Sequence, residues 1–426
     1  MKSPRYRPKD KLEKPFRQVL SLNAKINSLL ELDPLLSLIM KTAEGVMRAK
    51  ASSLMLLDER KNELVFRVAS GNKGDHLKEK FRVKVGEGIA GWVAKTGKPV
   101  IVDNPRNDKR FAQRFDQATG FKTQALICVP LLSKGKKIGV LEAMNPIGRN
   151  TFSGKDLELF EAFAEQAAIA IDNSRLHKIL LDQKVAEQEL KIAREIQQRF
   201  LPRINPDDMP FDIFCYNRPA RCVSGDFYDV QKTSSTSVSI ILGDVSGKGI
   251  PAALYMVKLI TDFRYLITHN LKTDILLSQL NRNLIADSYH GFFATALHLV
   301  YEHAAQAIRF TNAGHHSILI RRRQREKIIS VASSKSIPLG ISEEFCYTSE
   351  SLSLEPGDLL FIYTDGLIES RNPSGEEYSI ERLARILEAD YASATDCGDK
   401  VLEDLNRFGK NADPHDDLTF IAIRIK

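Results

Sequence analysis

Four aspartates in the C-terminal half of the chain stand at the ends of strand-like apolar runs: Asp226, Asp244, Asp365 and Asp416. Their contexts are VSGDFYDV, SIILGDVSGKG, LLFIYTDGL and DDLTFIAIRI. A carboxylate at a strand end lies at the rim of a sheet, and carboxylates from rims that meet stay ionised together only if a cation neutralises them. Mg²⁺ and Mn²⁺ prefer such oxygen ligands, and a pair of them activates water against a phosphate ester. We therefore predict that the four side chains converge on two divalent cations in a hydrolytic site.

The residues that follow Asp244 fit this prediction. Gly247 and Gly249 allow a tight backbone turn, which would direct the Val245 carbonyl toward a metal as well. Any one of the four aspartates, taken alone, is more often an ordinary turn residue, because Asp before Gly is common turn chemistry. The prediction therefore rests on the four of them together.

The segment that carries them, residues 205–426, has the pattern of an α+β domain. Strand-like runs alternate irregularly with helical runs and show no βαβ repeat, which is typical of antiparallel sheets flanked by helices. The strand-like runs are DIFCYNRPA, SVSIILGDV, FFATALHLVY, AIRFTNAGH, SILIRRR, DLLFIYTDG and LTFIAIRI. The helical runs are PAALYMVKLITDFRYLI, ILLSQLNRNLI and SIERLARILEAD.

Seven stretches of this segment, together with one just before it, resemble protein phosphatase 2C in its bacterial branch, typified by the phosphatase domain of stage II sporulation protein E. In family order they are IQQRFLP, VSGDFYDV, LGDVSGKGIPAAL, FFATALHLV, TNAGHH, IPLGI, FIYTDGLIES and DDLTFIAI. The resemblance implies an αββα sandwich with two Mn²⁺ or Mg²⁺ ions at one end of the paired sheets. It also implies that Asp244 bridges both ions, that Asp226 and the Val245 carbonyl complete one site, and that Asp365 and Asp416 hold the other.

The same resemblance points to residues that support these ligands. Asp229 is expected to orient ligands or water, and Asp417 to support or substitute for its neighbour Asp416. Gly225 and Gly366 stand beside ligands and are further supporting candidates. His315 is expected to be structural rather than a general acid. Ser224 stands where the family usually has Gly, a departure that leaves all four ligands in place.

The activity that the resemblance implies is hydrolysis of a phosphoserine or phosphothreonine ester on a partner protein. The usual substrate of this branch is a small phosphorylated anti-anti-sigma protein, and a helix that ends at the QxxxLP-like stretch Gln198–Pro202 can control assembly of the metal site. Three alternatives stay open. The segment would be a catalytically silent regulator that binds a phosphoprotein, the scaffold of a signal-binding dimer, or a nucleotide cyclase, for which no purine-pocket pattern is found.

Residues 20–175 predict a separate α+β sensor domain. Helical periodicity is followed by strand–turn–strand patterns, among them a hairpin over TQALICVPLLSKGKKIGVLEAMNP with SKGK as its turn. The stretches GEGIAGWVAKTGKPVIVDNPRND, FKTQALICVPL, IGVLEAMNP and FAEQAAIAIDNSRL resemble the GAF family. That family implies a small-molecule ligand or a dimerisation role. Of its cyclic-nucleotide signature, Asn145, Phe152 and Asp156 are present, but Pro146 and Leu157 depart from it, which does not favour a cyclic nucleotide.

Residues 176–204 predict a helical linker between the two domains. No Pro or Gly interrupts the helical pattern before Pro202, and a heptad count places eight residues on one seam, six of them apolar or Ala. The seam is Leu176, Ile179, Gln183, Ala186, Leu190, Ala193, Gln197 and Phe200. We predict a parallel coiled coil, and hence a homodimer; the alternative is an amphipathic helix that lies against its own domain.

Composition narrows the remaining possibilities. Of the net charge of +7, most of the excess lies in the N-terminal residues 1–19, which we expect to be a basic, disordered arm without a nucleic-acid partner. The chain lacks an apolar run long enough for a membrane helix, and its charged N-terminus lacks the pattern of a signal peptide. The 5 cysteines form no C-x-x-C pair. A cytoplasmic protein with reduced thiols and no membrane partner is expected.

Overall fold

The chain divides into two compact units that meet between Val185 and Ala186. The computed structural model describes residues 29–69, 82–288, 291–323, 327–332, 336–410 and 415–426. The basic arm predicted over residues 1–19 lies outside these ranges. No helix within them combines the length and the apolar character that a bilayer crossing requires.

The N-terminal unit is built on one antiparallel sheet, which in the described residues has six strands in the order β3-β2-β1-β6-β5-β4. The strands are β1 (Ala49–Asp58), β2 (Glu63–Ala69), β3 (Arg82–Lys84), β4 (Val100–Val102), β5 (Leu126–Ser133) and β6 (Lys136–Pro146). The helices are α2 (Leu32–Met47), α4 (Gly88–Thr96), α5 (Arg114–Thr119), the 3₁₀ turn η1 (Pro105–Asn107) and the first part of α6 (Gly154–Gln198). The predicted hairpin is confirmed as β5 and β6, and Lys134 and Gly135 take the positive φ values of its turn.

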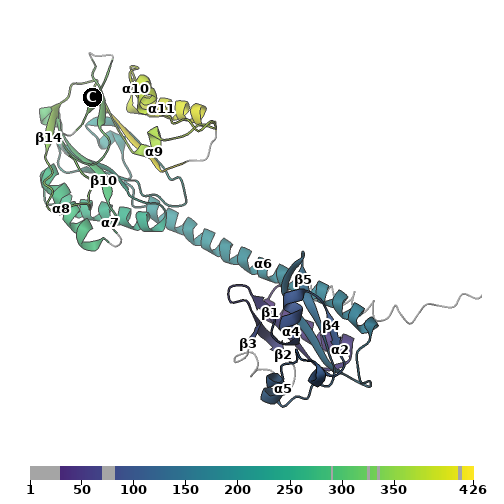
Figure 1. Ribbon diagram of the computed structural model, residues 1–426. Helices are drawn as coiled ribbons and strands as arrows, with labels where there is room; N and C mark the ends of the chain where they lie inside the picture. The colour runs from purple at the N-terminus through teal and green to yellow at the C-terminus, as the bar shows by residue number, and fades with distance from the viewer. Residues whose placement is uncertain (1–28, 70–81, 289–290, 324–326, 333–335, 411–414) are drawn as a thin grey trace, which may run out of the picture. The chain divides into compact units, whose positions relative to one another are not determined.

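Helices cover both faces of this sheet, as Figure 1 shows for α2 and α4. One face packs on α2 and on the first part of α6, where Phe160, Phe163 and Ile171 are fully buried. The other face packs on α4 through a second apolar cluster that includes Met55 and Val93. A strand covered on both faces needs apolar residues at successive positions, which accounts for the continuous run in β1.

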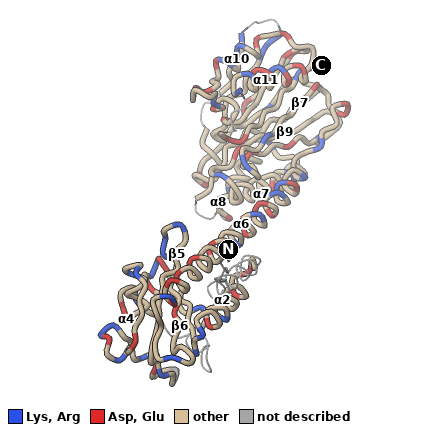
Figure 2. The backbone as a smooth tube through the Cα atoms, turned by 90° about the vertical axis from the view of Figure 1, so that its right-hand side faces the viewer, with Lys and Arg blue, Asp and Glu red and all other residues tan. Residues whose placement is uncertain are grey.

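Helix α6 is continuous over 45 residues, so the predicted long helix is confirmed. It begins with a capping box in which the Ser153 backbone N–H donates to Asp156 Oδ2 (2.7 Å) and Ser153 Oγ accepts from the Asp156 N–H (3.4 Å). No Pro or Gly follows Gly154 before Gln198, so nothing in the sequence breaks the helix. Figure 2 shows acidic and basic segments interspersed along α6, the pattern of a solvent-exposed helix surface.

The C-terminal unit contains two antiparallel sheets, each with five strands among the described residues. Their orders are β14-β11-β10-β9-β8 and β13-β12-β15-β16-β7. The strands of the first sheet are β8 (Phe227–Lys232), β9 (Ser237–Val245), β10 (Ala294–Glu302), β11 (Ala307–Ala313) and β14 (Glu350–Ser353). Those of the second are β7 (Phe211–Arg218), β12 (Ile318–Arg321), β13 (Ile328–Val331), β15 (Leu359–Tyr363) and β16 (Leu418–Ile425).

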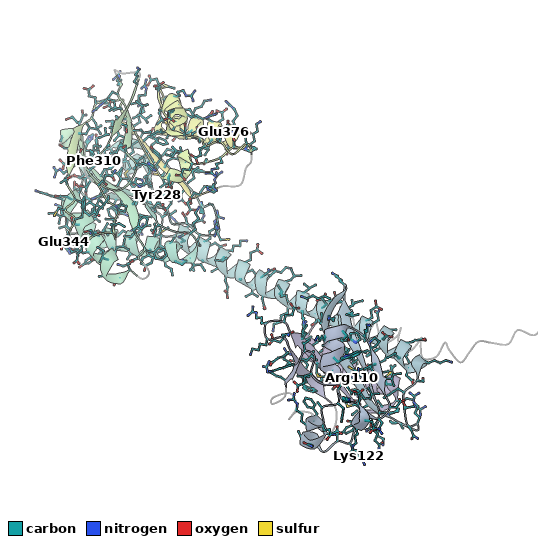
Figure 3. The ribbon with its side chains drawn as sticks, in the orientation of Figure 1. Arg110, Lys122, Tyr228, Phe310, Glu344 and Glu376 are labelled. Atoms are coloured by element: carbon teal, nitrogen blue, oxygen red, sulfur yellow. The ribbon has the colours of Figure 1, made fainter. Side chains whose placement is uncertain are left out.

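The two sheets pack face to face and helices cover their outer faces. Tyr228 and Phe310, both labelled in Figure 3, belong to the apolar core between the sheets. The pair α7 (Ile250–Ile267) and α8 (Thr273–Asp287) covers the first sheet, and α10 (Ile380–Leu387) and α11 (Ala394–Gly409) cover the second (Figure 1). The short elements are α9 (Asp365–Ile368), η2 (Pro206–Asp208) and η3 (His303–Ala305). The predicted αββα layering is thus confirmed.

Candidate metal centre

Strand register brings Asp226 and Asp244 side by side at one end of the first sheet. In the pairing of β8 with β9, Phe227 lies opposite Gly243, so Asp226, the residue before β8, lies next to Asp244 near the end of β9. The Val245 N–H donates to the Gly225 carbonyl (3.3 Å), which ties the two segments together beyond the ladder. Both carboxylates therefore project from the same edge of the sheet.

The second sheet contributes Asp365 and Asp416 in the same way. Asp365 is the first residue of α9, two residues after β15, and Asp416 precedes β16. In the pairing of these strands, Tyr363 lies opposite Phe420. A Cβ at Gly366 would overlap the Asp417 carbonyl oxygen, so only glycine allows the two segments to approach this closely.

Asp226 links the two sheets. Its Oδ2 accepts hydrogen bonds from Thr364 Oγ1 (2.8 Å) and Thr419 Oγ1 (2.6 Å), both of which belong to the second sheet or its edge. Asp226 is 1% exposed, so these hydroxyls replace the water that an ionised carboxylate would otherwise need. Neither threonine was predicted from the sequence, although both stand within the motifs that contain Asp365 and Asp416.

The carboxylates act on one another electrostatically. The pKa of Asp226 is raised, first by burial and then by the negative charge of Asp244. The pKa of Asp244 is raised to about 7 by burial, with Asp365, Asp416 and Asp417 as the next causes. Burial and the charge of Asp416 also raise the pKa of Asp365. The structure therefore brings all four predicted aspartates into one region in which adding negative charge is unfavourable.

Other groups of the chain hold Asp416 and Asp417. Lys248 Nζ lies 2.8 Å from Asp416 Oδ2 and also donates to the His415 carbonyl (3.1 Å). Asp417 accepts from the backbone N–H groups of Ala220 and Gly225, both at 2.7 Å. Asp417 thus orders the segment before Asp226, a supporting role, and both of its oxygens are already engaged. Lys248 is a positive charge at the site that the sequence analysis missed.

The donor set fits hard divalent cations, although no three His, Cys, Asp or Glu side chains of the described residues are grouped closely enough to hold a metal ion. Asp226 is bonded to two threonine hydroxyls and Asp416 to Lys248. Carboxylates and a backbone carbonyl are the ligands that Mg²⁺ and Mn²⁺ prefer. A Cβ at Gly225 would lie 2.9 Å from the Val245 carbonyl oxygen and 3.2 Å from Asp244 Oδ1, so glycine keeps this recess clear. The assignment of individual ligands stays a prediction.

The end of α6 contacts the segment that carries Asp226. Gln197 is buried, and its side chain pairs with the backbone of Ser224: Nε2 donates to the Ser224 carbonyl (2.8 Å), and Oε1 accepts from the Ser224 N–H (2.9 Å). Ser224 Oγ in turn accepts from the Asp226 N–H (3.1 Å). The resemblance was placed at Gln198–Pro202, but a QxxxLP pattern that ends at Pro202 begins at Gln197, and Gln198 is exposed. The glutamine of that pattern was therefore the signal for Gln197.

A second contact holds the chain just beyond α6. Arg264 of α7 donates from Nε to Asp229 Oδ2 (2.6 Å) and from Nη2 to the Phe200 carbonyl (2.6 Å). The other hydrogen bonds of Asp229 come from the Val230 N–H and from Gln231 Nε2. Asp229 therefore fixes the linker end through Arg264, and these contacts do not support the expectation that it orients metal ligands.

His315 is held within the turn that follows β11. Its backbone N–H donates to Asn312 Oδ1 (2.7 Å), and Nδ1 lies 2.9 Å from Thr295 Oγ1. Burial lowers the pKa of His315 to about 3, with the neighbouring His316 as a smaller cause. A half-buried imidazole that is held in this way and whose pKa is lowered suits the structural role that we expected for it.

A second phosphatase chemistry does not fit the structure. Cys215 and Arg221 have C-x₅-R spacing, the pattern of enzymes that form a phosphocysteine. Cys215, however, lies within strand β7 rather than in a loop, and burial raises the pKa of its thiol, which opposes a thiolate nucleophile.

The N-terminal unit also holds a half-buried carboxylate on the face of its sheet that packs on α4. Glu142 of β6 accepts a hydrogen bond from Ser53 Oγ (2.7 Å) and lies beside Cys128. Burial raises the pKa of Glu142 and also that of the Cys128 thiol. In the partial cyclic-nucleotide signature, Asn145 bonds to the Lys122 carbonyl and to the Gln124 N–H, a local structural role.

Comparisons with known proteins agree with this arrangement. The sequence model of stage II sporulation protein E matches residues 234–426, and that of the GAF domain matches residues 30–172. The SiaA-PP2C domain of Pseudomonas aeruginosa superposes with a TM-score of 0.51 at 18% identity, over 57% of this chain and 99% of that chain, which shows a shared fold. The chain thus carries a GAF domain followed by a PP2C-type phosphatase domain of the stage II sporulation protein E kind.

Two curated proteins are similar to more than half of the chain. Protein IcfG of Synechocystis sp. is 30% identical over 277 residues, which are 58% of this chain and 43% of that protein. Phosphoserine phosphatase RsbU of Bacillus subtilis is 29% identical over 246 residues, 57% of this chain and 72% of that protein. The match therefore spans less than half of IcfG and about three quarters of RsbU.

Proposed function

We propose that the chain is a metal-dependent protein serine/threonine phosphatase under the control of its GAF domain. The observation that carries the proposal is the convergence of Asp226, Asp244, Asp365 and Asp416 at adjoining ends of the two sheets, where burial and mutual repulsion raise the pKa of three of them. A fold that only bound a phosphoprotein would gain nothing from such a cluster, since like charges repel the phosphate as well. The similarity to a phosphoserine phosphatase supports the same reaction class.

Within this proposal, Asp226, Asp244 and the Val245 carbonyl hold one divalent cation, and Asp244, Asp365 and Asp416 hold a second, as Mn²⁺ or Mg²⁺. When bound, such ions supply positive charge to the phosphoryl oxygens and make water a better nucleophile. Thr364 and Thr419 orient Asp226, and the backbone N–H groups that Asp417 holds keep the Gly225 turn in place. Lys248 orients Asp416 and adds a positive charge at the site where a phosphate monoester would enter.

The test is release of phosphate from a phosphoserine peptide by the full chain, with and without Mn²⁺. Wild type is expected to release phosphate only with the metal, Asp244→Asn to be inactive, and Asp399→Asn, which removes an exposed acid on α11, to behave as wild type. Equal activity of Asp244→Asn and wild type would contradict the bridging role. No release by wild type would favour the silent, phosphoprotein-binding alternative.

We infer that the GAF domain regulates the phosphatase through α6. The inference is supported by the pairing of Gln197 with the Ser224 backbone and by the Ser224 bond to the Asp226 N–H, which connect the end of the helix to a metal-site residue. A signal bound in the GAF domain, such as a small molecule, would act by favouring one of two arrangements of this contact. Deletion of residues 1–175 tests this, because unchanged turnover and metal affinity would show that the two domains are not coupled.

The substrate that best fits the resemblance is a small phosphorylated anti-anti-sigma protein. The proposal is tested by comparing phosphate release from such a protein carrying phosphoserine with release from a phosphotyrosine peptide. A preference for phosphotyrosine would overturn the substrate class while leaving the metal chemistry intact.

We further propose that the chain is a homodimer through the middle of α6. Leu176, Ile179 and Val185 are 47–56% exposed there, which is unusual for side chains of this size. The C-terminal end of the predicted seam is used within the chain, because Gln197 is buried against Ser224. Sedimentation is expected to show a dimer that Leu176→Lys/Ile179→Lys converts to a monomer. Gln188→Lys/Glu195→Lys changes two exposed residues that lie off the seam, and this variant should remain a dimer.

A further inference from the structure

A pocket of about 490 Å³ lies at the junction of the linker end with the phosphatase domain. Three segments line it: the chain between Arg199 and Arg203, strand β8 at Val230 and Gln231, and helix α7 at Arg264. Its volume falls in the range of about 300–1,000 Å³ that is typical of small-molecule sites. The pocket is separate from the acidic cluster, since none of the four aspartates lines it.

The charge of this pocket is positive. Arg199, Arg203 and Arg264 line it, and no acidic residue does. Arg264 is engaged with Asp229 and with the Phe200 carbonyl. For the side chains of Arg199 and Arg203, no ion pair or hydrogen bond is found within the part of the chain that the structure describes, and both residues are exposed. Two cationic side chains at the mouth of a pocket are therefore available to a ligand.

We propose that this pocket binds a small anion that carries phosphate groups. Guanidinium groups present planar, paired donors that match phosphate oxygens, and three of them line one pocket here. Leu201, Pro202 and Val230 supply an apolar wall against which a flat or apolar part of the ligand packs. A nucleic-acid strand fits less well, because no aromatic side chain lines the pocket for base stacking.

Such a ligand would stabilise the arrangement in which residues 199–203, the linker end, lie against β8 and α7. We call this arrangement the docked form. It contacts Arg199 and Arg203 on one side and β8 and α7 on the other, so it binds only when these segments lie together. The same docked form places Gln197 on the Ser224 backbone. The anion therefore strengthens the contact that leads to Asp226. This consequence for the enzyme rests on the proposed function, whereas binding itself does not.

The binding experiment uses the full chain freed of divalent cations on a chelating resin, so that the probe cannot bind through a metal. Inorganic pyrophosphate is titrated calorimetrically into wild type, into Arg199→Gln/Arg203→Gln, and into Arg282→Gln/Arg407→Gln, which removes two exposed charges elsewhere. We expect the pocket variant to bind at least about 10-fold more weakly and the control to match wild type. Equal affinity of all three proteins, no binding by wild type, or citrate binding as tightly as pyrophosphate overturns the proposal.

Hydrogen exchange of the same metal-free samples tests the consequence. Pyrophosphate is expected to slow exchange of the Ser224 amide, whose hydrogen bond to Gln197 forms only in the docked arrangement, in wild type and the control but not in the pocket variant. Pyrophosphate binding without slower exchange at Ser224 would overturn the coupling. Because neither measurement uses catalysis, failure of the phosphatase proposal would leave both results interpretable.

Discussion

The two domains bury carboxylates in different ways. In the GAF domain Glu142 stands alone, accepts a hydrogen bond from Ser53, and has its pKa raised chiefly by burial. In the phosphatase domain several carboxylates share one region, and for Asp244 the negative neighbours add to the effect of burial. A single buried carboxylate can become neutral at low cost, whereas a cluster of them stays ionised only with added positive charge. The number of like charges, rather than burial, therefore distinguishes a chemical site from a structural one.

The largest effect that would test this comparison is on metal binding. Asp244→Asn is expected to weaken Mn²⁺ binding by more than the about 10- to 100-fold that loss of an outer partner typically costs, because it removes the negative charge of the ligand that, in our proposal, both ions would share. Glu142→Gln, the matched change in the GAF domain, should leave Mn²⁺ affinity unchanged. Titration calorimetry measures both, and similar losses in the two variants would erase the distinction between the domains.

The contact between the linker and the site should give the next largest effect. Gln197→Ala removes both hydrogen bonds to the Ser224 backbone, and we expect it to weaken Mn²⁺ binding by about 10- to 100-fold, as loss of an outer-shell partner does. Gln198→Ala changes the adjacent exposed glutamine and is the control. If the two variants bound Mn²⁺ equally well, the helix end would have no part in shaping the site.

Two glycines, Gly225 beside the acidic cluster and Gly45 in α2, offer a test of local packing in each domain. Gly225→Ala forces a Cβ to within 2.9 Å of the Val245 carbonyl oxygen, and should lower the unfolding free energy by about 1–3 kcal/mol and weaken metal binding. In Gly45→Ala, within α2, the added Cβ meets no atom within 4 Å, and the substitution should raise the unfolding free energy by about 0.5–1 kcal/mol. Urea unfolding of each variant measures the change, and a stabilised Gly225→Ala protein would show that the recess is not tightly packed.

The smallest expected effect concerns pH and Glu142. Because burial raises the folded-state pKa of Glu142 above its unfolded value, its contribution to stability is complete at pH values below the unfolded pKa of about 4.3 and is lost as pH rises through the folded pKa. Glu142→Gln keeps an oxygen that can accept from Ser53, so it should lie within about 1 kcal/mol of wild type at low pH. As pH rises, the variant should become more stable relative to wild type, as measured by the urea midpoints of unfolding. The opposite trend would contradict the direction of the pKa shift.

Several elements of the fold could be predicted because their signals are local. The apolar runs at 237–245 and 418–425 are strands β9 and β16 with the predicted bounds, and the uninterrupted helical pattern after residue 160 belongs to α6. Strand β8 was missed because its residues Phe227–Lys232 mix aromatic and charged side chains, and α11 was missed because Ala394–Gly409 includes two glycines. Tertiary packing against apolar neighbours outweighs weak local preference in both.

The chain order of its motifs was enough to determine that this protein joins a sensor domain to a domain with four strand-end aspartates, since strand ends and turns follow from nearby residues. The groups that bond to those aspartates could be identified only in the folded chain. Thr419 reaches Asp226 across 193 positions, and Gln197 reaches Ser224 across 27. Lys248, in the loop between β9 and α7, meets Asp416, which precedes β16 of the other sheet. Such pairings depend on how two sheets and a helix end pack, which no short stretch of sequence contains.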